Sequence, residues 1–279
     1  MDMAKPFVKW AGGKRQLISQ IVEKLPPGFG EGTFRKYAEP FVGGGALLFH
    51  LFKHNLIDEA YISDNNPEII NVYITIKNDV QGLIKQLQIL QDEYDSAKDN
   101  PEERRFDYFK HRDEFNDMNL RMLENETTKR AAYFIYLNKT GFNGLFRVNK
   151  KGGFNVPPSS LKDKTFLDEN NLKEVSKVLQ NVKIHHGDFQ ACENWVDSDT
   201  FVYFDPPYRP LTKTSFTTYS SHSWNDDKEQ IRLANFVKKL AKGLKLMISN
   251  SNPEDVNDGD PFFAEQFPDN QGFFRTPVQ

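Results

Sequence analysis

The 279-residue sequence has one cysteine, Cys192, and only short unbroken apolar runs. A single cysteine excludes an intrachain disulfide and a cysteine-rich zinc site. A membrane helix needs about 20 apolar residues, whereas a typical run here covers only residues 46–49. The first ten residues have no apolar core followed by a small-residue cleavage site, so we expect no signal peptide. These features predict a cytoplasmic protein without a membrane partner.

Excess positive charge is also absent, because the formal net charge is −3 and the isoelectric point is about 6.1. This argues against a histone-like coating protein, but charge that is segregated along the chain still permits nucleic-acid binding. Residues 127–162 contain no acid and seven cations, which are Lys129, Arg130, Lys139, Arg147, Lys150, Lys151 and Lys162. Residues 246–274 contain no Lys or Arg and six acids, which are Glu254, Asp255, Asp258, Asp260, Glu265 and Asp269. The basic stretch fits either a solvated face or a surface that contacts phosphates, and its interleaved aromatics and asparagines favour the second.

Hydrophobic periodicity predicts alternating strands and helices at both ends of the chain. Strands are expected at 36–41, 59–63, 182–185, 200–204 and 244–249, and helices at 13–25, 46–52, 67–77, 168–179 and 226–242. Residues 80–139 are expected to be helical almost throughout, and residues 141–158 to form hairpins or ordered loops. The pattern predicts a doubly wound α/β domain from residues 1–78 and 165–279, with residues 79–164 inserted into it. In such a domain the ligand site lies at the carboxyl ends of the strands.

A glycine-rich turn, residues 42–45, connects the first predicted strand to a helix. Consecutive glycines let the backbone approach a ligand closely, although a tight strand-to-helix turn is the simpler explanation of the glycines taken alone. The turn matches neither the spaced glycines of nicotinamide binders nor a phosphate-binding loop. Asp64 ends the next strand, where a carboxylate suits ribose hydroxyls or caps the following helix. Together the two features indicate an adenosine-type ligand.

Two further groups of residues near these strands have competing interpretations. Trp10 and Lys14 flank a Gly-Gly pair and suit either a wall for a zwitterionic ligand or a core aromatic beside a solvated lysine. His185 and His186 have no cysteine nearby and no partner at helical spacing, so we interpret them as core or strand histidines and expect no metal.

The tetrapeptide Asp205-Pro206-Pro207-Tyr208 follows an apolar strand. A proline-rich turn with a capping aspartate would explain the prolines but not the tyrosine. An exocyclic amine on an aromatic ring is a poor nucleophile, and a carboxylate together with the Pro206 carbonyl can accept its two N–H groups. Tyr208 can stack on the ring, and a base in a duplex must be flipped out to reach such a pocket.

Taken in order, these residues resemble the Dam-type DNA adenine methyltransferases, including restriction-modification members that recognise GATC. The matching pieces are residues 9–14, 39–45, 138–157, 188–189 and 205–208 with Asp64, and more loosely 216–219 and 249–252. The resemblance implies a class I S-adenosylmethionine-dependent fold with a mixed, mainly parallel sheet and a target-recognition domain at residues 79–164. It also implies direct methyl transfer to adenine N6 in double-stranded DNA, with S-adenosylhomocysteine as product.

The resemblance also assigns roles to individual residues. The cofactor site would consist of Trp10, Lys14, Glu39, Phe41, Gly43, Asp64, Asp188, Phe189 and Asp205. The flipped adenine would be held by Asp205, Pro206 and Tyr208. The DNA contacts would come from Lys9, Phe142, Asn143, Leu145, Arg147, Asn149 and Pro157. Among these, Arg147 resembles a bidentate guanine reader, Lys9 a second base reader, and Phe142 and Asn143 the residues that enter the base stack.

The sequence departs from this family in two places. Residues 158–162 replace an aromatic-Gly-Arg-Tyr-Lys run, which bears on whether GATC is the target. The sequence stops at Gln279, where the family continues with a further strand, so we expect the sheet to lack its last strands.

We therefore expect an adenine-N6 DNA methyltransferase of a bacterial or phage modification system, with a cognate restriction endonuclease as functional partner. An RNA base methyltransferase and a catalytically silent DNA-binding module are the alternatives. A cytosine-N4 enzyme more often has Ser at the position of Asp205, and a protein-glutamine enzyme more often has Asn.

Overall fold

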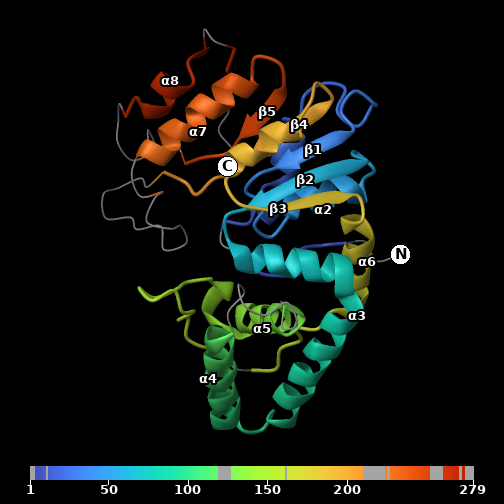
Figure 1. Ribbon diagram of the computed structural model, residues 1–279, viewed down its shortest axis with the longest axis vertical. Coiled ribbons are helices and arrows are strands. Elements are labelled where there is room, and N and C mark those ends of the chain that lie inside the picture. Colours follow the sequence, from blue (N-terminus) through green and yellow to red (C-terminus); the bar gives the residue numbers. More distant parts are fainter. Residues whose placement is uncertain are drawn as a thin grey trace.

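The computed structural model describes residues 4–10, 12–118, 127–160, 162–209, 224, 227–251, 260–269 and 272–273. A five-stranded sheet lies in the upper half of the molecule as drawn in Figure 1, above helices α4 (Pro101–Asp117) and α5 (Thr127–Thr140). The strands are β1 (Lys36–Glu39), β2 (Glu59–Asp64), β3 (Val182–His186), β4 (Thr200–Phe204) and β5 (Lys245–Ile248). Their order is β3-β2-β1-β4-β5, and every neighbouring pair is parallel.

The strand order reverses between β1 and β4. The chain moves outward from β1 through β2 to β3 and then returns to place β4 on the other side of β1. Lys36 pairs with Thr200 and Ala38 with Val202, so the carboxyl ends of both strands lie together. This reversal is where doubly wound sheets form their ligand crevice.

Alternation along the central strands divides the core into two layers. Phe201 and Tyr203 belong to one apolar cluster, whereas Val202 and Phe204 belong to the other. All five residues of β4 are buried, as expected for a parallel strand covered on both faces.

Helices cover both faces (Figure 1). The first cluster packs beneath α1 (Ile18–Val22), α2 (Ala46–Lys53), α3 (Pro67–Ser96) and α6 (Glu169–Leu179). The second packs against η3 (Phe189–Asn194) and α7 (Asp227–Leu240), with α8 (Phe262–Gln266) following β5. No helix among the described residues is long and apolar enough to cross a membrane.

The predicted helix at 13–25 is shorter in the structure. A 3₁₀ turn, η1 (Lys14–Gln16), comes first, and α1 spans only Ile18–Val22. Gly13 offers no capping side chain, so the first turn closes through the Leu17 N–H to the Lys14 carbonyl instead.

Residues 80–139, expected to be helical almost throughout, contribute to three helices in the part of the chain that the structure describes. Helix α3 runs on from the sheet domain, bends at Asp79 and ends at Ser96. Helix α4 (Pro101–Asp117) begins at Asn100, whose side chain accepts the Glu103 N–H, and α5 is Thr127–Thr140. The Asn-Pro pair supplies the cap and the first helical position that start a new helix.

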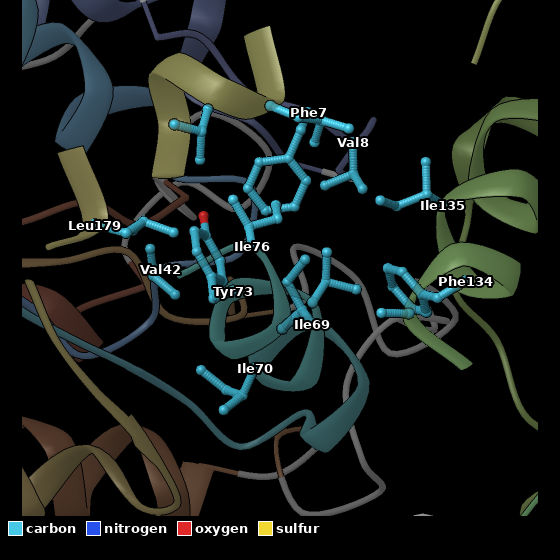
Figure 2. Packing of buried hydrophobic residues seen from close by; sticks show 14 of the residues in the cluster. Phe7, Val8, Val42, Ile69, Ile70, Tyr73, Ile76, Phe134, Ile135 and Leu179 are labelled. Atoms are coloured by element: carbon cyan, nitrogen blue, oxygen red, sulfur yellow. The ribbon is translucent and has the colours of Figure 1, made fainter. Parts of the chain in front are cut away.

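Helix α5 is almost entirely buried. Figure 2 shows Phe134 and Ile135 of this helix facing Ile69 of α3 and the amino-terminal Val8 within one cluster. The apolar core therefore continues from the sheet face into the helical part.

One buried ion pair ties the three helices together. The Arg130 guanidinium of α5 binds Glu68 of α3, with Nε–Oε2 at 2.9 Å and Nη2–Oε1 at 2.5 Å. It also donates to the Phe115 and Met118 carbonyls at the end of α4. Arg130, included above in the basic stretch, is 9% exposed and is thus a structural residue rather than a phosphate contact.

Replacing Arg130 by Met is expected to lower the free energy of unfolding by about 3–5 kcal/mol, because Glu68 and two carbonyls lose their buried partner. Urea denaturation measures the change. The side chain of the neighbouring Lys129 is 44% exposed and its Nζ lies 3.8 Å from Glu114 Oε2, so Lys129→Met should cost less than about 1 kcal/mol. Equal losses in the two variants would contradict this interpretation.

Candidate active site

The carboxyl ends of β1 and β4 bring three distant segments together. Lys14 Nζ lies 2.7 Å from Asp205 Oδ1, and the two side chains are 8% and 17% exposed. The ammonium group also donates to the Gly12 carbonyl at 2.7 Å and lies 4.5 Å from the centre of the Tyr208 ring. The buried Lys14 and the half-buried Asp205 and Tyr208 therefore form one cluster, as expected if all three belong to one site.

Burial sets the protonation of this cluster. It raises the pKa of Asp205 to about 6, while the nearby Lys14 ammonium works in the opposite direction. Burial also raises the pKa of Glu39, at the end of β1, well above its usual range. Glu39 Oε2 is buried and has no hydrogen-bond partner among the described residues. The site thus holds an unused acceptor beside a carboxylate.

Trp10 packs against the glycine turn. Gly43 has φ +45°, and a Cβ there would lie 2.5 Å from Trp10 Cδ1. Gly45 has φ +67°, and a Cβ there would lie 2.5 Å from the Tyr73 hydroxyl oxygen. Both positions therefore require glycine for their backbone angle and for their space.

Asp64 holds the same turn from β2. Its Oδ2 accepts the Gly43 N–H at 3.0 Å, and its Oδ1 accepts the Asn66 N–H at 2.9 Å. The cap of helix α3 is Asn66, whose side chain accepts the Glu68 N–H. The helix-capping interpretation of Asp64 is therefore wrong, and its carboxylate shapes the glycine turn.

Aromatic rings form the side of the site near β3. The Phe41 and Phe189 rings stack with centroids 5.4 Å apart, and the Trp224 edge meets Phe41 at 5.5 Å. Phe189 is only 3% exposed, because the Arg232 guanidinium covers it at 4.2 Å.

Asp188 begins the short helix η3 and is already paired. Its side chain accepts the Gln190 N–H at 3.0 Å and binds Arg232, with Nη2–Oδ2 at 2.6 Å. Although partial burial opposes it, these two partners hold the pKa of Asp188 below its usual range.

The two histidines before Asp188 are exposed strand residues rather than core residues. His185 stacks near Tyr61 at 6.2 Å. Within the described residues, no cluster of three His, Cys, Asp or Glu side chains is arranged to hold a metal ion.

The predicted DNA-reading hairpin lies beside the amino-terminal segment. Its two antiparallel bridges pair Gly141 with Pro158 and Val148 with Phe154. The buried Asn138 side chain accepts the Lys9 N–H at 2.8 Å and donates to the Lys9 carbonyl at 2.8 Å and the Gly144 carbonyl at 2.9 Å. Lys9 thus sits against the hairpin, one residue before Trp10.

The hairpin presents its predicted contact residues unequally. Phe142 is 50% exposed, and Asn143, Asn149 and Pro157 are exposed as well. Leu145 is half-buried against the core, and the Asn149 side chain accepts the Lys151 and Gly153 N–H groups within the hairpin turn. Arg147 is held by Asn155, with Nε–Oδ1 at 2.8 Å and Nη2 to the Asn155 carbonyl at 3.1 Å.

The sequence assigned no separate role to Asn138 or Asn155, although both lie in the matching stretch. Asn138 directly follows an apolar run, which predicts that it is buried. A buried amide must have hydrogen-bond partners, so this position could have been recognised as a structural contact. Ala11, Asn252 and residues 216–219 lie outside the described residues.

A parallel sheet with this reversal, a glycine turn after β1 and an acidic tetrapeptide after β4 defines the class I methyltransferase fold. Residues 10–269 match the family model for D12 class N6 adenine-specific DNA methyltransferases, and the chain belongs to this family.

Relatives of this chain are named as type II methyltransferases or as DNA adenine methylases. The chain is 53% identical over 249 residues to the type II methyltransferase M.MjaIII of Methanocaldococcus jannaschii, covering 88% of this chain and 84% of the relative. It is 36% identical over 251 residues to the type II methyltransferase M1.LlaDCHI of Lactococcus lactis subsp. cremoris, covering 89% and 81%. It is 32% identical over 276 residues to the DNA adenine methylase of Haemophilus influenzae, covering 99% and 86%. The predicted fold and the predicted adenine-specific DNA methyltransferase activity are confirmed.

Lys14→Met is expected to raise the pKa of Asp205 above about 6, because the variant removes the cation that favours the carboxylate. The ¹³C chemical shift of the labelled aspartate carboxyl, followed against pH, measures it. Lys9→Met removes an exposed cation outside this cluster and serves as the control. An unchanged titration in Lys14→Met would show that the Lys14–Asp205 contact does not set the charge of the site.

Proposed function

We propose that this chain methylates adenine N6 in double-stranded DNA with S-adenosylmethionine, using the cluster at the reversal of the sheet. The observation that carries this proposal is the buried contact of Lys14 with Asp205 and Tyr208, next to the glycine turn. A carboxylate at a sheet reversal can accept a hydrogen bond from an amine and can also lie next to a cationic cofactor.

The residues around the turn fit S-adenosylmethionine. Glu39 offers a buried oxygen without a hydrogen-bond partner among the described residues, which suits an N–H of the cofactor, and the Asp205 carboxylate suits its positive charge. In this proposal Asp64, which also accepts the Gly43 N–H, binds the ribose hydroxyls with the remaining acceptor capacity of its oxygens, and Trp10 packs on the adjoining turn. The remaining proposed contacts are Lys14, Phe41, Asp188 and Phe189. When bound, this cofactor supplies an electrophilic methyl group.

The chain itself makes the adenine amine reactive. Asp205 accepts one N6 N–H and the Pro206 carbonyl accepts the other, which withdraws the nitrogen lone pair from the ring. Tyr208 stacks on the flipped base. The Lys14 ammonium forms an ion pair with the Asp205 carboxylate, which balances its negative charge before the amine binds. Above about pH 6 Asp205 is ionised, so it can also take up the proton that the adenine amine loses when it is methylated.

Residues 79–164 supply target recognition in this proposal. Arg147 is fixed by Asn155 through Nε and one Nη2 proton. The outer Nη1 and Nη2 edge then matches the two acceptors of guanine. Phe142 and Asn143 are exposed at the hairpin, as residues that enter the space of a flipped base must be. Lys9, Leu145, Asn149 and Pro157 complete the proposed contact surface.

We propose GATC as the target on the likeness of residues 138–157, with residues 158–162 as the place where specificity would differ. The relatives named type II methyltransferases support a modification role beside a cognate restriction endonuclease in a bacterial or archaeal cytoplasm. Family membership favours DNA over the RNA substrate considered from sequence.

Duplexes with and without GATC, incubated with labelled S-adenosylmethionine, test the reaction and the target together. N6-methyladenine confined to the GATC duplex is expected. The same product in duplexes without GATC would show that the target sequence is another one. No product on any duplex would refute the proposed function. Asp205→Asn should lower kcat by about 10²–10⁴-fold, because it removes the negative acceptor. Asp199→Asn, at an exposed position before β4, should not lower it.

Arg147→Ala should relax discrimination at one guanine by about 1–3 kcal/mol, because the bidentate donor is lost. Methylation rates on duplexes with each single substitution of the site measure the effect. Lys150→Ala, at an exposed hairpin position, should instead weaken binding to all duplexes alike and reduce its salt dependence. A uniform loss in Arg147→Ala would contradict its role as a base reader.

A further inference from the structure

A pair of amide side chains holds the backbone on both sides of Tyr208. Gln230 of α7 donates from Nε2 to the Pro207 carbonyl at 2.9 Å. Asn250, after β5, donates from Nδ2 to Gln230 Oε1 at 3.0 Å. The Arg209 N–H donates to Asn250 Oδ1 at 3.0 Å. The four groups form one hydrogen-bonded chain that begins and ends on the backbone flanking Tyr208.

The backbone fixes the direction of this chain of bonds. A carbonyl can only accept, so the Gln230 NH₂ group must face Pro207. A peptide N–H can only donate, so the Asn250 oxygen must face Arg209. Each side chain therefore has to donate and accept at once, which only a neutral amide does in these two orientations.

The two amides stand on a rigid frame. Gln230 is 3% exposed and lies on α7, which packs on the sheet through Leu233 and Val237. Arg209 is anchored from outside, with Nε–Oδ1 of Asp227 and Nη1–Oδ2 of Asp260 both at 2.7 Å. Burying an amide costs free energy unless its N–H and C=O groups are hydrogen-bonded. Gln230 and Asn250 meet this need with the backbone of the loop around Tyr208 and with each other.

Fixing these two bonds fixes Tyr208. The Pro207 carbonyl lies in the peptide plane before Tyr208, and the Arg209 N–H lies in the plane after it. Because peptide groups are planar, holding both planes sets the φ and ψ of Tyr208 and thus the direction of its side chain. The ring of Pro207 fixes one of the torsions that lead back to the Pro206 carbonyl.

We propose that Gln230 and Asn250 are positioning residues, which aim the Tyr208 ring and the Pro206 carbonyl at the flipped adenine. The proposal rests on the proposed function of residues 205–208. Neither amide lies in the set of residues assigned to cofactor or DNA. They act on the alignment of the reacting groups, and so on kcat rather than on binding.

Gln230→Met keeps the length of the side chain and removes both hydrogen bonds. It is expected to lower kcat on the target duplex on the order of 10²-fold, as small misplacements in an active site do. The KM for DNA and the Kd for S-adenosylmethionine should change by less than about 3-fold, because no ligand contact is lost.

Gln230→Glu tests whether Gln230 acts through its hydrogen bonds or only by filling the space around the loop. An ionised carboxylate repels the Pro207 carbonyl, whereas the protonated acid donates to it as the amide does. The ratio of Q230E to wild-type kcat should therefore rise as the pH falls from 8 to 6.5. The ratio for Gln230→Met should stay low and flat over the same range.

Gln91 offers a matched control. Gln91 is also a buried glutamine whose side-chain amide hydrogen-bonds to the backbone, because it donates to the Lys164 carbonyl and accepts the Phe166 N–H. It lies on α3, outside residues 205–208. Gln91→Met should lower the unfolding midpoint and leave kcat near the wild-type value. If Gln230→Met does not fold, Asn250→Asp keeps the acceptor for Arg209, loses the donor to Gln230, and should show the same pH-dependent ratio as Q230E.

The outcomes separate the two proposals. A wild-type protein without methyl transfer refutes the proposed function and this inference with it. An active wild type refutes the inference alone if folded Gln230→Met has kcat within 3-fold of wild type. A flat Q230E ratio, or an equal loss of kcat in Gln91→Met, also refutes it.

Discussion

The reversal of strand order between β1 and β4 is the constraint on which the site depends. Parallel strands end at one edge of a sheet, and only at the reversal do the two following turns leave in opposite directions. The turn after β1 provides glycines and the turn after β4 provides Asp205, so a glycine-lined backbone and a carboxylate lie at the same edge of the sheet. The strands are buried on both faces, which keeps these turns in register.

The amino-terminal segment couples the two halves of the molecule. Lys9 is bonded through Asn138 to the hairpin, Trp10 packs on the glycine turn, and Lys14 reaches Asp205. Three residues between positions 9 and 14 therefore contact the proposed DNA reader, the proposed cofactor site and the proposed catalytic carboxylate.

Burial decides what each charged or polar group does. Arg130 lies in an acid-free stretch of sequence, yet its guanidinium is hydrogen-bonded to Glu68 and to two backbone carbonyls. Arg147, in the same stretch, keeps one edge of its guanidinium outside its bonds to Asn155. The difference follows from their elements, because α5 is buried between α3 and α4 while the hairpin is not.

Local sequence determined the strands, the glycine turn and the tetrapeptide at residues 205–208, because apolar runs and turn residues are signals read within a few positions. It also determined the family, since the motifs keep their order along the chain. It missed the breaks within residues 80–139, because polar helical sequence continues across them and only the Asn-Pro pair marks a new start.

Tertiary structure alone decided which partners these residues have. The pairing of Glu68 with Arg130 spans 62 positions, and Gln230 and Asn250 meet Tyr208 from a helix and a strand end that lie apart in sequence. No periodicity encodes such contacts. They exist because folding places a donor and an acceptor in a space without water, where each must find the other.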